Sequence, residues 1–324
     1  HRPRAVHQIL MGAFYHRPVM LEECMEGLNI KPDGVYFDGT VGGGGHSFEI
    51  LARSPQGRLI ATDLDDEAIA AATERLAPFR GRFHIHKSDY KDYERVLEEE
   101  GAEKLDGVIL DFGVSSHQLD DRSRGFSYMA REAALDMRMD LSASLTAKDV
   151  VNTYPESALI RILREYGEER FALQIARNIV REREKREIGT SGELTDIVER
   201  SIPYRFRQNG PCQRKTFQAI RIEVNGELNG LKECVKGLTG KLKKGGRIVI
   251  LTFHSLEDRI VKEAFREMAA DCVCPPGFPV CVCGKKKEID IITKKPVTAS
   301  EEEQRENTRS KCAKLRIAEK ITED

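Results

Sequence analysis

The chain has 324 residues and a formal net charge of −1, with 40% hydrophobic and 32% charged residues. This length predicts two domains with large cores, and the small net charge means that nucleic acid could be bound only by a local patch. No apolar run is long enough for a membrane span, and no signal peptide is visible, so we expect no membrane contact. Half of the eight cysteines cluster within 272–283, which favours a reduced, cytoplasmic protein over a disulfide framework. Residues 1–15 are expected to be an N-terminal extension, with Met11 a candidate start.

The first part of the chain alternates strand-like and helix-like segments. Apolar runs predict strands at 35–40, 58–63, 83–89 and 107–114. Helices are expected at about 46–53, from the cap Asp65 onward, and at 91–100. This alternation predicts an α/β fold with a doubly wound, mostly parallel sheet.

The alternation then stops and later returns. Residues 136–215 have helical periodicity, which predicts an inserted all-helical domain within a domain made of 16–135 and 216–324. The second part of that domain is expected to contain a helix over 217–242, a strand over 246–253 and a helix over 255–268 capped by Ser255. Strand candidates at 289–295 and 314–320 follow, with a solvated acidic run at 301–303 between them.

A run of four glycines, Gly42 to Gly45, follows the first predicted strand. Glycines let the backbone turn tightly and approach a ligand, and the next helix offers free N–H groups. The dinucleotide fingerprint requires a third glycine, but that position is Ser47 or Phe48, depending on the register. No Lys-Ser or Lys-Thr pair follows the glycines, which excludes a P-loop.

Acidic residues follow the first two predicted strands. Asp63 ends the second strand, where a carboxylate can accept both ribose hydroxyls of an adenosine, and Asp38 ends the first. This combination favours S-adenosylmethionine over NAD, with Asp38, Gly44, Gly45, His46 and Asp63 as the cofactor set. The structural alternative is a tight turn with a surface aspartate.

Further candidates follow the third and fourth predicted strands. Tyr90 could flank an adenine, while the neighbouring Asp89 could equally be a helix cap. Asp111 ends an apolar strand, where a carboxylate is costly unless it is paired or faces a ligand. Two serines and Gln118 follow it, and capping groups in a turn are the alternative.

Two later segments also carry polar candidates. Gln218, Arg221 and Asn225 share one face of a predicted helix, which could be a solvated face, and His254 follows the strand at 246–253 as either a cleft residue or a structural histidine. The segment 200–222 is basic and contains no acid. Its basic residues could contact phosphates while its aromatic side chains stack on unpaired bases. The alternative is that 200–222 is a surface loop with no RNA contact. The candidate RNA contacts are Arg205, Arg207, Arg214, Lys215 and Arg221.

The four clustered cysteines, Cys272, Cys274, Cys281 and Cys283, form two C-x-C pairs. Four thiolates suit zinc, but zinc sites usually have two to four residues within a pair. We therefore assign no metal ligand, and zinc binding by these cysteines stays open.

Long motifs resemble one family, the bacterial 16S ribosomal RNA cytosine-N4 methyltransferases (RsmH, formerly MraW). They include DGTVGGGGHS (38–47), DGVILDFGVSSHQLDD (106–121), LDMRMD (135–140), TFQAIRIEVNGEL (216–228) and GGRIVILTFHSLEDRIVK (245–262). The resemblance implies a class I methyltransferase domain with a helical insertion. It also implies methyl transfer from S-adenosylmethionine to the N4 amine of a decoding-centre cytidine in 16S rRNA of the small ribosomal subunit. Its cofactor positions fall on Gly44, Gly45, His46, Asp63, Tyr90, Asp111 and Gln118.

The family resemblance leads to an expected catalytic set. Many amino-methyltransferases use an Asp/Asn-Pro-Pro-aromatic motif after the fourth strand, and Asp111-Phe112-Gly113-Val114 stands there without prolines. Asp111 is the expected catalytic group, with Asn225 and His254 as second choices. A small-molecule methyltransferase and a non-catalytic assembly factor that binds rRNA and the cofactor are the alternatives. The oligomeric state is left open, a homodimer included.

Overall fold

The computed structural model describes residues 17–115, 118, 121–207, 210–275 and 280–323. The chain divides into two compact units, His1–Gly113 with Gly230–Asp324, and Val114–Asn229. The insertion predicted at 136–215 lies inside the second unit, which begins earlier and ends later. The extension expected at 1–15 lies outside the described residues.

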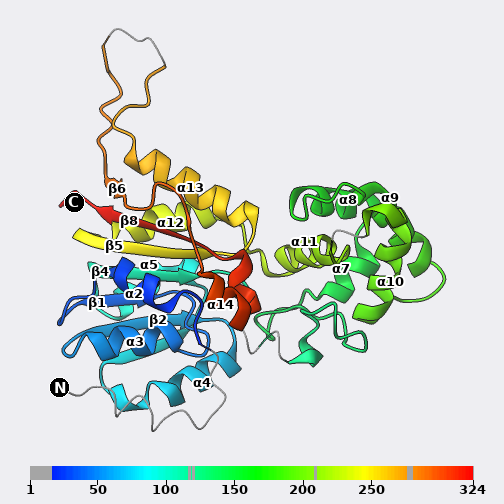
Figure 1. Ribbon diagram of the computed structural model, residues 1–324, viewed down its shortest axis with the longest axis horizontal. Coiled ribbons are helices and arrows are strands. Elements are labelled where there is room, and N and C mark those ends of the chain that lie inside the picture. Colours follow the sequence, from blue (N-terminus) through cyan, green and yellow to red (C-terminus); the bar gives the residue numbers. More distant parts are fainter. Residues whose placement is uncertain (1–16, 116–117, 119–120, 208–209, 276–279, 324) are drawn as a thin grey trace. The chain divides into compact units, whose positions relative to one another are not determined.

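The first unit is built on one sheet in the order β3-β2-β1-β4-β5-β8-β6 (Figure 1). Strands β1 to β5 pair with one another in parallel, while β8 pairs antiparallel with β5, β6 and β7. This confirms the predicted doubly wound, mostly parallel fold. The strands are β1 Val35–Asp38, β2 Arg58–Asp63, β3 Phe83–Lys87, β4 Leu105–Asp111, β5 Leu242–Thr252, β6 Ile289–Ile291, β7 Val297–Thr298 and β8 Lys314–Lys320.

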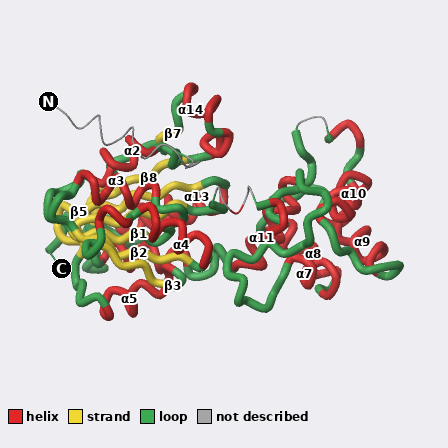
Figure 2. Tube along the Cα trace, turned by 90° about the horizontal axis from the view of Figure 1, so that it is seen from below, coloured by secondary structure: helices red, strands yellow, loops and turns green. Residues whose placement is uncertain are grey.

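Helices cover both faces of this sheet, as the tube view also shows (Figure 2). On one face, Ile50 and Met25 pack in a common core with Tyr36, Ile109 and Val249 of the sheet. Burial of such apolar surface is the main force that holds helix and sheet together. This face carries α2 Leu21–Leu28, α3 Gly45–Arg53 and α4 Asp66–Arg75, and the opposite face carries α5 Tyr93–Glu99, α12 Leu231–Gly240 and α13 Ser255–Ala269.

The second unit is helical in its described part. Its core gathers apolar residues at helical spacing, such as Leu159 and Ile162 on one helix and Ile175 and Ile179 on the next. Capping boxes start two of the helices, because Thr146 and Thr190 each exchange hydrogen bonds with the residue three positions on. The helices are α7 Ala147–Thr153, α8 Glu156–Glu165, α9 Ala172–Arg183, α10 Ser191–Ser201 and α11 Arg214–Asn225.

Two local predictions are wrong, and the structure adds detail to a third. The helix expected over 217–242 is two helices, because Gly226 and Gly230 adopt φ values of 57° and 64° between α11 and α12. The cap of α13 is His254 and not Ser255, since the His254 ring accepts from the Glu257 N–H. The acidic run at 301–303 is largely solvent-exposed as predicted, and it also forms the first turn of α14, Glu301–Glu306, where negative charge is favourable.

Within the described ranges, no helix combines the length and the apolar character that crossing a membrane requires.

Candidate cofactor site and methyl-transfer edge

The glycine turn connects β1 to α3 at the carboxyl edge of the sheet. Gly42 and Gly44 have φ values of 50° and 75°, a region that side chains strongly disfavour. A Cβ on Gly45 would lie 2.2 Å from Pro18 Cγ, whereas a Cβ on Gly43 would meet nothing within 4 Å. Conformation therefore explains the glycine at position 44, and close packing explains the glycine at position 45. Gly43, which was not among the predicted cofactor residues, borders open space.

Asp38, the last residue of β1, is buried, and both of its carboxylate oxygens hold this turn. Its Oδ1 accepts from the Thr40 N–H at 3.1 Å, and its Oδ2 accepts from the Ser47 hydroxyl at 2.6 Å. Burial raises the pKa of Asp38, although these hydrogen bonds and His46 oppose the shift. In this geometry the carboxylate positions the turn and the start of α3.

Asp63, the last residue of β2, joins the second strand to the same turn. Its Oδ2 accepts from the Gly42 N–H at 2.8 Å, and its Oδ1 accepts from the Asp65 N–H at 3.0 Å. Burial raises the pKa of Asp63 to about 6 despite these two hydrogen bonds. A carboxylate has about four lone-pair sites, so Asp63 keeps acceptor capacity for a ribose hydroxyl.

Asp111, the last residue of β4, lies beside His46 of α3. His46 is buried, with Nε2 3.1 Å from the Val19 carbonyl oxygen and Nδ1 3.8 Å from Asp111 Oδ2. The carbonyl can only accept, so Nε2 carries a proton. Asp111 Oδ1 is buried and has no hydrogen-bond partner among the described residues. Such an orphaned carboxylate oxygen needs a partner, which a bound substrate or cofactor can supply.

Charges around Asp111 come from three elements. Burial raises the pKa of this carboxyl most, and Glu257 adds to the increase, whereas His46 and Arg309 oppose it. Arg309 belongs to a 3₁₀ turn near the end of the chain and lies over the Phe253 ring at 5.4 Å. Arg309 was missed at the sequence level because nothing in its spacing connects it to the sheet edge.

Tyr90 follows β3 at the same edge. Its ring centroid is 5.6 Å from that of Phe112, so the two aromatic rings form a tilted pair beyond β3 and β4. Asp89 accepts from the Lys91 N–H and caps the short turn that contains Tyr90. The capping alternative for Asp89 is therefore confirmed.

The side chain of His254, two residues beyond β5, is buried. Its Nδ1 accepts from the Glu257 N–H at 3.4 Å. Its Nε2 lies 3.0 Å from Glu257 Oε1 but has no hydrogen-bond partner among the described residues. These contacts fit the structural alternative, in which the histidine starts α13.

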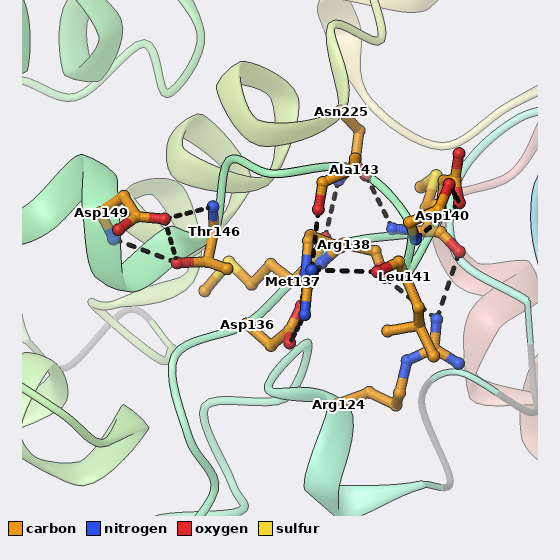
Figure 3. Close-up of polar contacts among 12 residues, drawn as sticks. Arg124, Asp136, Met137, Arg138, Asp140, Leu141, Ala143, Thr146, Asp149 and Asn225 are labelled. Carbon is orange, nitrogen blue, oxygen red and sulfur yellow. Dashed lines mark hydrogen bonds and ion pairs between the residues drawn. The ribbon is translucent and has the colours of Figure 1, made fainter.

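Asn225 ends α11 in the second unit, where Figure 3 shows its contacts with the loop that follows Asp136. Its Nδ2 donates to the Met137 and Arg221 carbonyls at 2.8 and 2.9 Å, and its Oδ1 accepts from the Met139 N–H at 2.8 Å. Met137 has a φ of 62° and is buried, so the side-chain amide stabilises a strained loop.

The remaining predicted contacts also belong to the second unit. Gln118 is buried, and its Oε1 accepts from the Ser115 N–H at 3.0 Å. Arg221 makes two hydrogen bonds to Glu227 at 2.8 and 2.9 Å, which neutralises its charge locally. Arg205 and Arg214 are exposed, and Lys215 is exposed while donating to the Glu168 carbonyl. Arg207 is half-buried and donates to the Ile202 carbonyl.

The polar edge of the first unit lies at the place where the sheet order reverses. Asp38 and Asp111 end β1 and β4, the two strands on either side of that reversal, and Asp63 ends the next strand. Ligands of doubly wound sheets bind outside the carboxyl ends at this point. The open space at Gly43 and the orphaned oxygen of Asp111 fit a nucleoside cofactor there. Fold and site together define a class I methyltransferase.

The chain belongs to the MraW methylase family, whose profile matches residues 13–321. "Ribosomal RNA small subunit methyltransferase H 2" of Agathobacter rectalis is 54% identical over 310 residues, which cover 95% of this chain and 98% of the relative. The methyltransferases H of Lachnospira eligens and Clostridioides difficile are 53% and 51% identical, over 95% of this chain and 98% and 99% of theirs. The chain is thus a methyltransferase, and its cofactor is S-adenosylmethionine.

Proposed function

We propose that this protein methylates the N4 amine of a decoding-centre cytidine in 16S rRNA of the small ribosomal subunit, in the cytoplasm. The observation that carries the proposal is Asp111, a half-buried carboxylate with an orphaned oxygen at the switch point of the sheet. The names of relatives more than 50% identical support 16S rRNA as the substrate class. The cofactor supplies an electrophilic methyl group on its sulfonium.

The turn residues bind and orient the cofactor in this proposal. Asp63 accepts hydrogen bonds from the ribose hydroxyls, and the space at Gly43 admits the ligand close to the backbone. Tyr90 flanks the adenine, and Gln118 is proposed to add a polar contact. Asp38 and His46 act mainly by fixing the turn, since both use their polar atoms on neighbours.

Asp111 acts on the nucleophile. The cytosine amine is a weak nucleophile because its lone pair is delocalised into the ring. The partly exposed Asp111 carboxylate accepts one N4–H, which aligns the amine with the methyl group and favours a tetrahedral nitrogen. The new N–C bond forms as the S–C bond breaks, and one amine proton leaves to Asp111 or to water. Asn225 and His254 are second choices. The contacts of Asn225 with the loop after Asp136 disfavour it, whereas His254 keeps an unpaired Nε2 beside Glu257.

The second unit supplies the proposed RNA contacts. Tyr204 is 73% exposed, beside the exposed Arg205, whereas Phe217 is buried. An open aromatic ring beside a guanidinium suits an unpaired base and its phosphate. Arg205, Arg207, Arg214 and Lys215 are the proposed contacts, and Arg221 is the weakest because Glu227 pairs with it.

The test is tritium transfer from labelled S-adenosylmethionine to small subunits isolated from a strain that lacks this modification. We expect label in 16S rRNA and N4-methylcytidine after nuclease digestion. Label in no RNA would refute the proposal and favour the assembly factor, and label in a small molecule of a cell extract would favour the second alternative.

An Asp111→Ala variant tests the assigned residue. We expect a loss of about 10²–10⁴-fold in the rate of transfer, which is the usual scale for a group that handles a proton. Asp33→Asn, which changes an exposed carboxylate, is the matched control and should keep full activity. Full methylation by Asp111→Ala together with tight cofactor binding would show that Asp111 is not a catalytic residue.

A further inference from the structure

Four cysteines lie on the segment between α13 and β6, outside the polar edge described above. Cys272 and Cys274 follow α13, and Cys281 and Cys283 precede β6. Ile289 of β6 pairs with Lys320, and β8 runs antiparallel to β5, so this segment reaches the sheet at the edge opposite Asp38 and Asp111. Figure 1 shows it as a long loop that projects beyond α13.

The four sulfur atoms meet in one cluster. All lie within 4.8 Å of one another. Cys281 Sγ is 3.5 Å from both Cys272 Sγ and Cys283 Sγ, and it is 3.9 Å from Cys274 Sγ. The distance between Cys272 Sγ and Cys283 Sγ is also 3.9 Å. The C-x-C spacing, which is unusual for a zinc site, thus does not prevent the two pairs from converging.

These separations match the edges of a metal–thiolate tetrahedron. Zinc–sulfur bonds of about 2.3 Å at tetrahedral angles place neighbouring sulfur atoms about 3.8 Å apart. A disulfide would require about 2.05 Å. The cluster has the size of a four-coordinate site and not of two covalent pairs.

Backbone N–H groups point at two of the sulfur atoms. The Val273 N–H donates to Cys283 Sγ and the Cys274 N–H donates to Cys272 Sγ, both at 3.4 Å. Outer donors of this kind stabilise thiolates and orient metal ligands. The Val273 contact also connects the two arms of the loop.

The described part of this loop has no apolar core of its own. Val273, Val280 and Val282 are 64%, 69% and 74% exposed, so the apolar residues between the cysteines do not form a core. Short segments without a core usually depend on a disulfide or a metal. Soft thiolate ligands select zinc over magnesium or calcium.

We propose that Cys272, Cys274, Cys281 and Cys283 bind one zinc ion that closes this loop. A full set of four protein ligands leaves no open position, so the role is structural and not catalytic. Zinc binding releases the thiol protons and stabilises the loop in its folded form.

The test compares metal content in the full chain purified under reducing conditions. We expect one zinc per chain, and less than a tenth of that in Cys272→Ser/Cys281→Ser. Cys212→Ser, which changes a cysteine of the second unit, should keep the zinc. After zinc is removed with a chelator, cobalt(II) should produce the absorption bands of a tetrahedral thiolate site in the unmodified chain and in Cys212→Ser only.

Cofactor binding separates loss of the metal from loss of the fold. The double variant should bind S-adenosylmethionine as the unmodified chain does, while the 272–283 segment becomes more sensitive to protease. Equal zinc content in the double variant, or a chain that binds neither zinc nor cobalt at this cluster, would overturn the proposal.

Discussion

Asp63 has two roles that both require a charged carboxylate, whereas its burial disfavours that charge. It fixes the glycine turn through the Gly42 N–H and, in the proposed function, it accepts the ribose hydroxyls. Both roles favour the carboxylate, but burial raises its pKa to about 6. The folded pKa lies above the unfolded value, so the folded state binds more protons and stability falls as pH rises through roughly 4 to 6. The apo protein therefore carries a cost at neutral pH that bound cofactor offsets.

We predict that cofactor affinity rises with pH until Asp63 is ionised. Below pH 6 the dissociation constant should increase by up to about tenfold per pH unit, because a pKa difference of one unit corresponds to about 1.4 kcal/mol. Titration calorimetry between pH 5 and 8 measures this. Asp63→Asn should bind more weakly and lose this part of the pH dependence. Identical pH profiles for both proteins would show that another group is responsible.

Tyr204 provides a second test at the level of one residue. Tyr204→Ala should weaken binding to 16S rRNA by about 1–3 kcal/mol, because it removes a stacking surface for one base. Tyr204→Phe keeps the ring and should bind as the unmodified chain does. Fluorescence anisotropy with a labelled rRNA fragment measures the difference. Equal losses in both variants would point to the hydroxyl and not to stacking.

The residues at strand ends were predictable, but their contacts were not. Asp38, Asp63 and Asp111 each follow an apolar run, and the carboxyl ends of parallel strands share one edge. Loop geometry decides which polar atoms are paired at this edge. The Ser47 hydroxyl donates to Asp38 Oδ2, and Thr40 Oγ1 accepts from the Asp111 N–H at 2.7 Å. Such pairings have no periodic signature in the sequence.

Among the elements, α13 and β8 are joined by a buried ion pair. Arg316 donates through Nε and Nη2 to the two Asp258 oxygens at 2.6 and 2.9 Å. Burial raises the pKa of Asp258, but Arg316 more than compensates and lowers it below its ordinary value. This stabilisation is complete above the unfolded pKa and is lost as pH falls through the folded pKa.

We predict that Asp258→Ala lowers the free energy of unfolding by about 3–5 kcal/mol, because it leaves a buried guanidinium without its partner. Glu301→Ala, which breaks an exposed pair with Arg305, should cost less than about 1 kcal/mol. Denaturant unfolding at neutral pH compares the two. A similarly small loss of unfolding free energy in both variants would mean that water solvates Arg316 when Asp258 is absent.

Element type was predictable where the sequence pattern was unambiguous. Apolar runs predicted the strands at 58–63 and 314–320, and a capping aspartate, Asp65, predicted the start of α4. The break between α11 and α12 was missed because apolar spacing continues across Gly226 and Gly230. Backbone conformation decided that boundary, and apolar periodicity does not report it.

For the whole molecule, the net charge of −1 conceals a basic segment in the second unit. Binding of polyanions by such a segment depends on the release of counterions, so it should weaken steeply with salt. Overall charge would not indicate this, and the sequence did so only through the local run of basic residues over 200–222.

We predict that Arg205→Ala/Arg214→Ala lowers the slope of log affinity for 16S rRNA against log salt by about 0.7 for each phosphate that the variant no longer neutralises. The double variant Arg95→Ala/Arg305→Ala removes the same charge from exposed pairs of the first unit and should keep the slope. Filter binding at several salt concentrations measures both. Equal slopes for the unmodified chain and both double variants would show that Arg205 and Arg214 do not contact RNA phosphates.

The position of β8 in the sheet has a consequence during synthesis. Residues 314–320 pair with both β5 and β6, and Arg316 is the partner of the buried Asp258. Until residues 314–320 have left the ribosome, β5 is an open edge with free N–H and C=O groups, and Asp258 has no counterion from β8. A chain that stops before residue 314 would therefore contain every proposed catalytic group while the β5 edge stays unpaired.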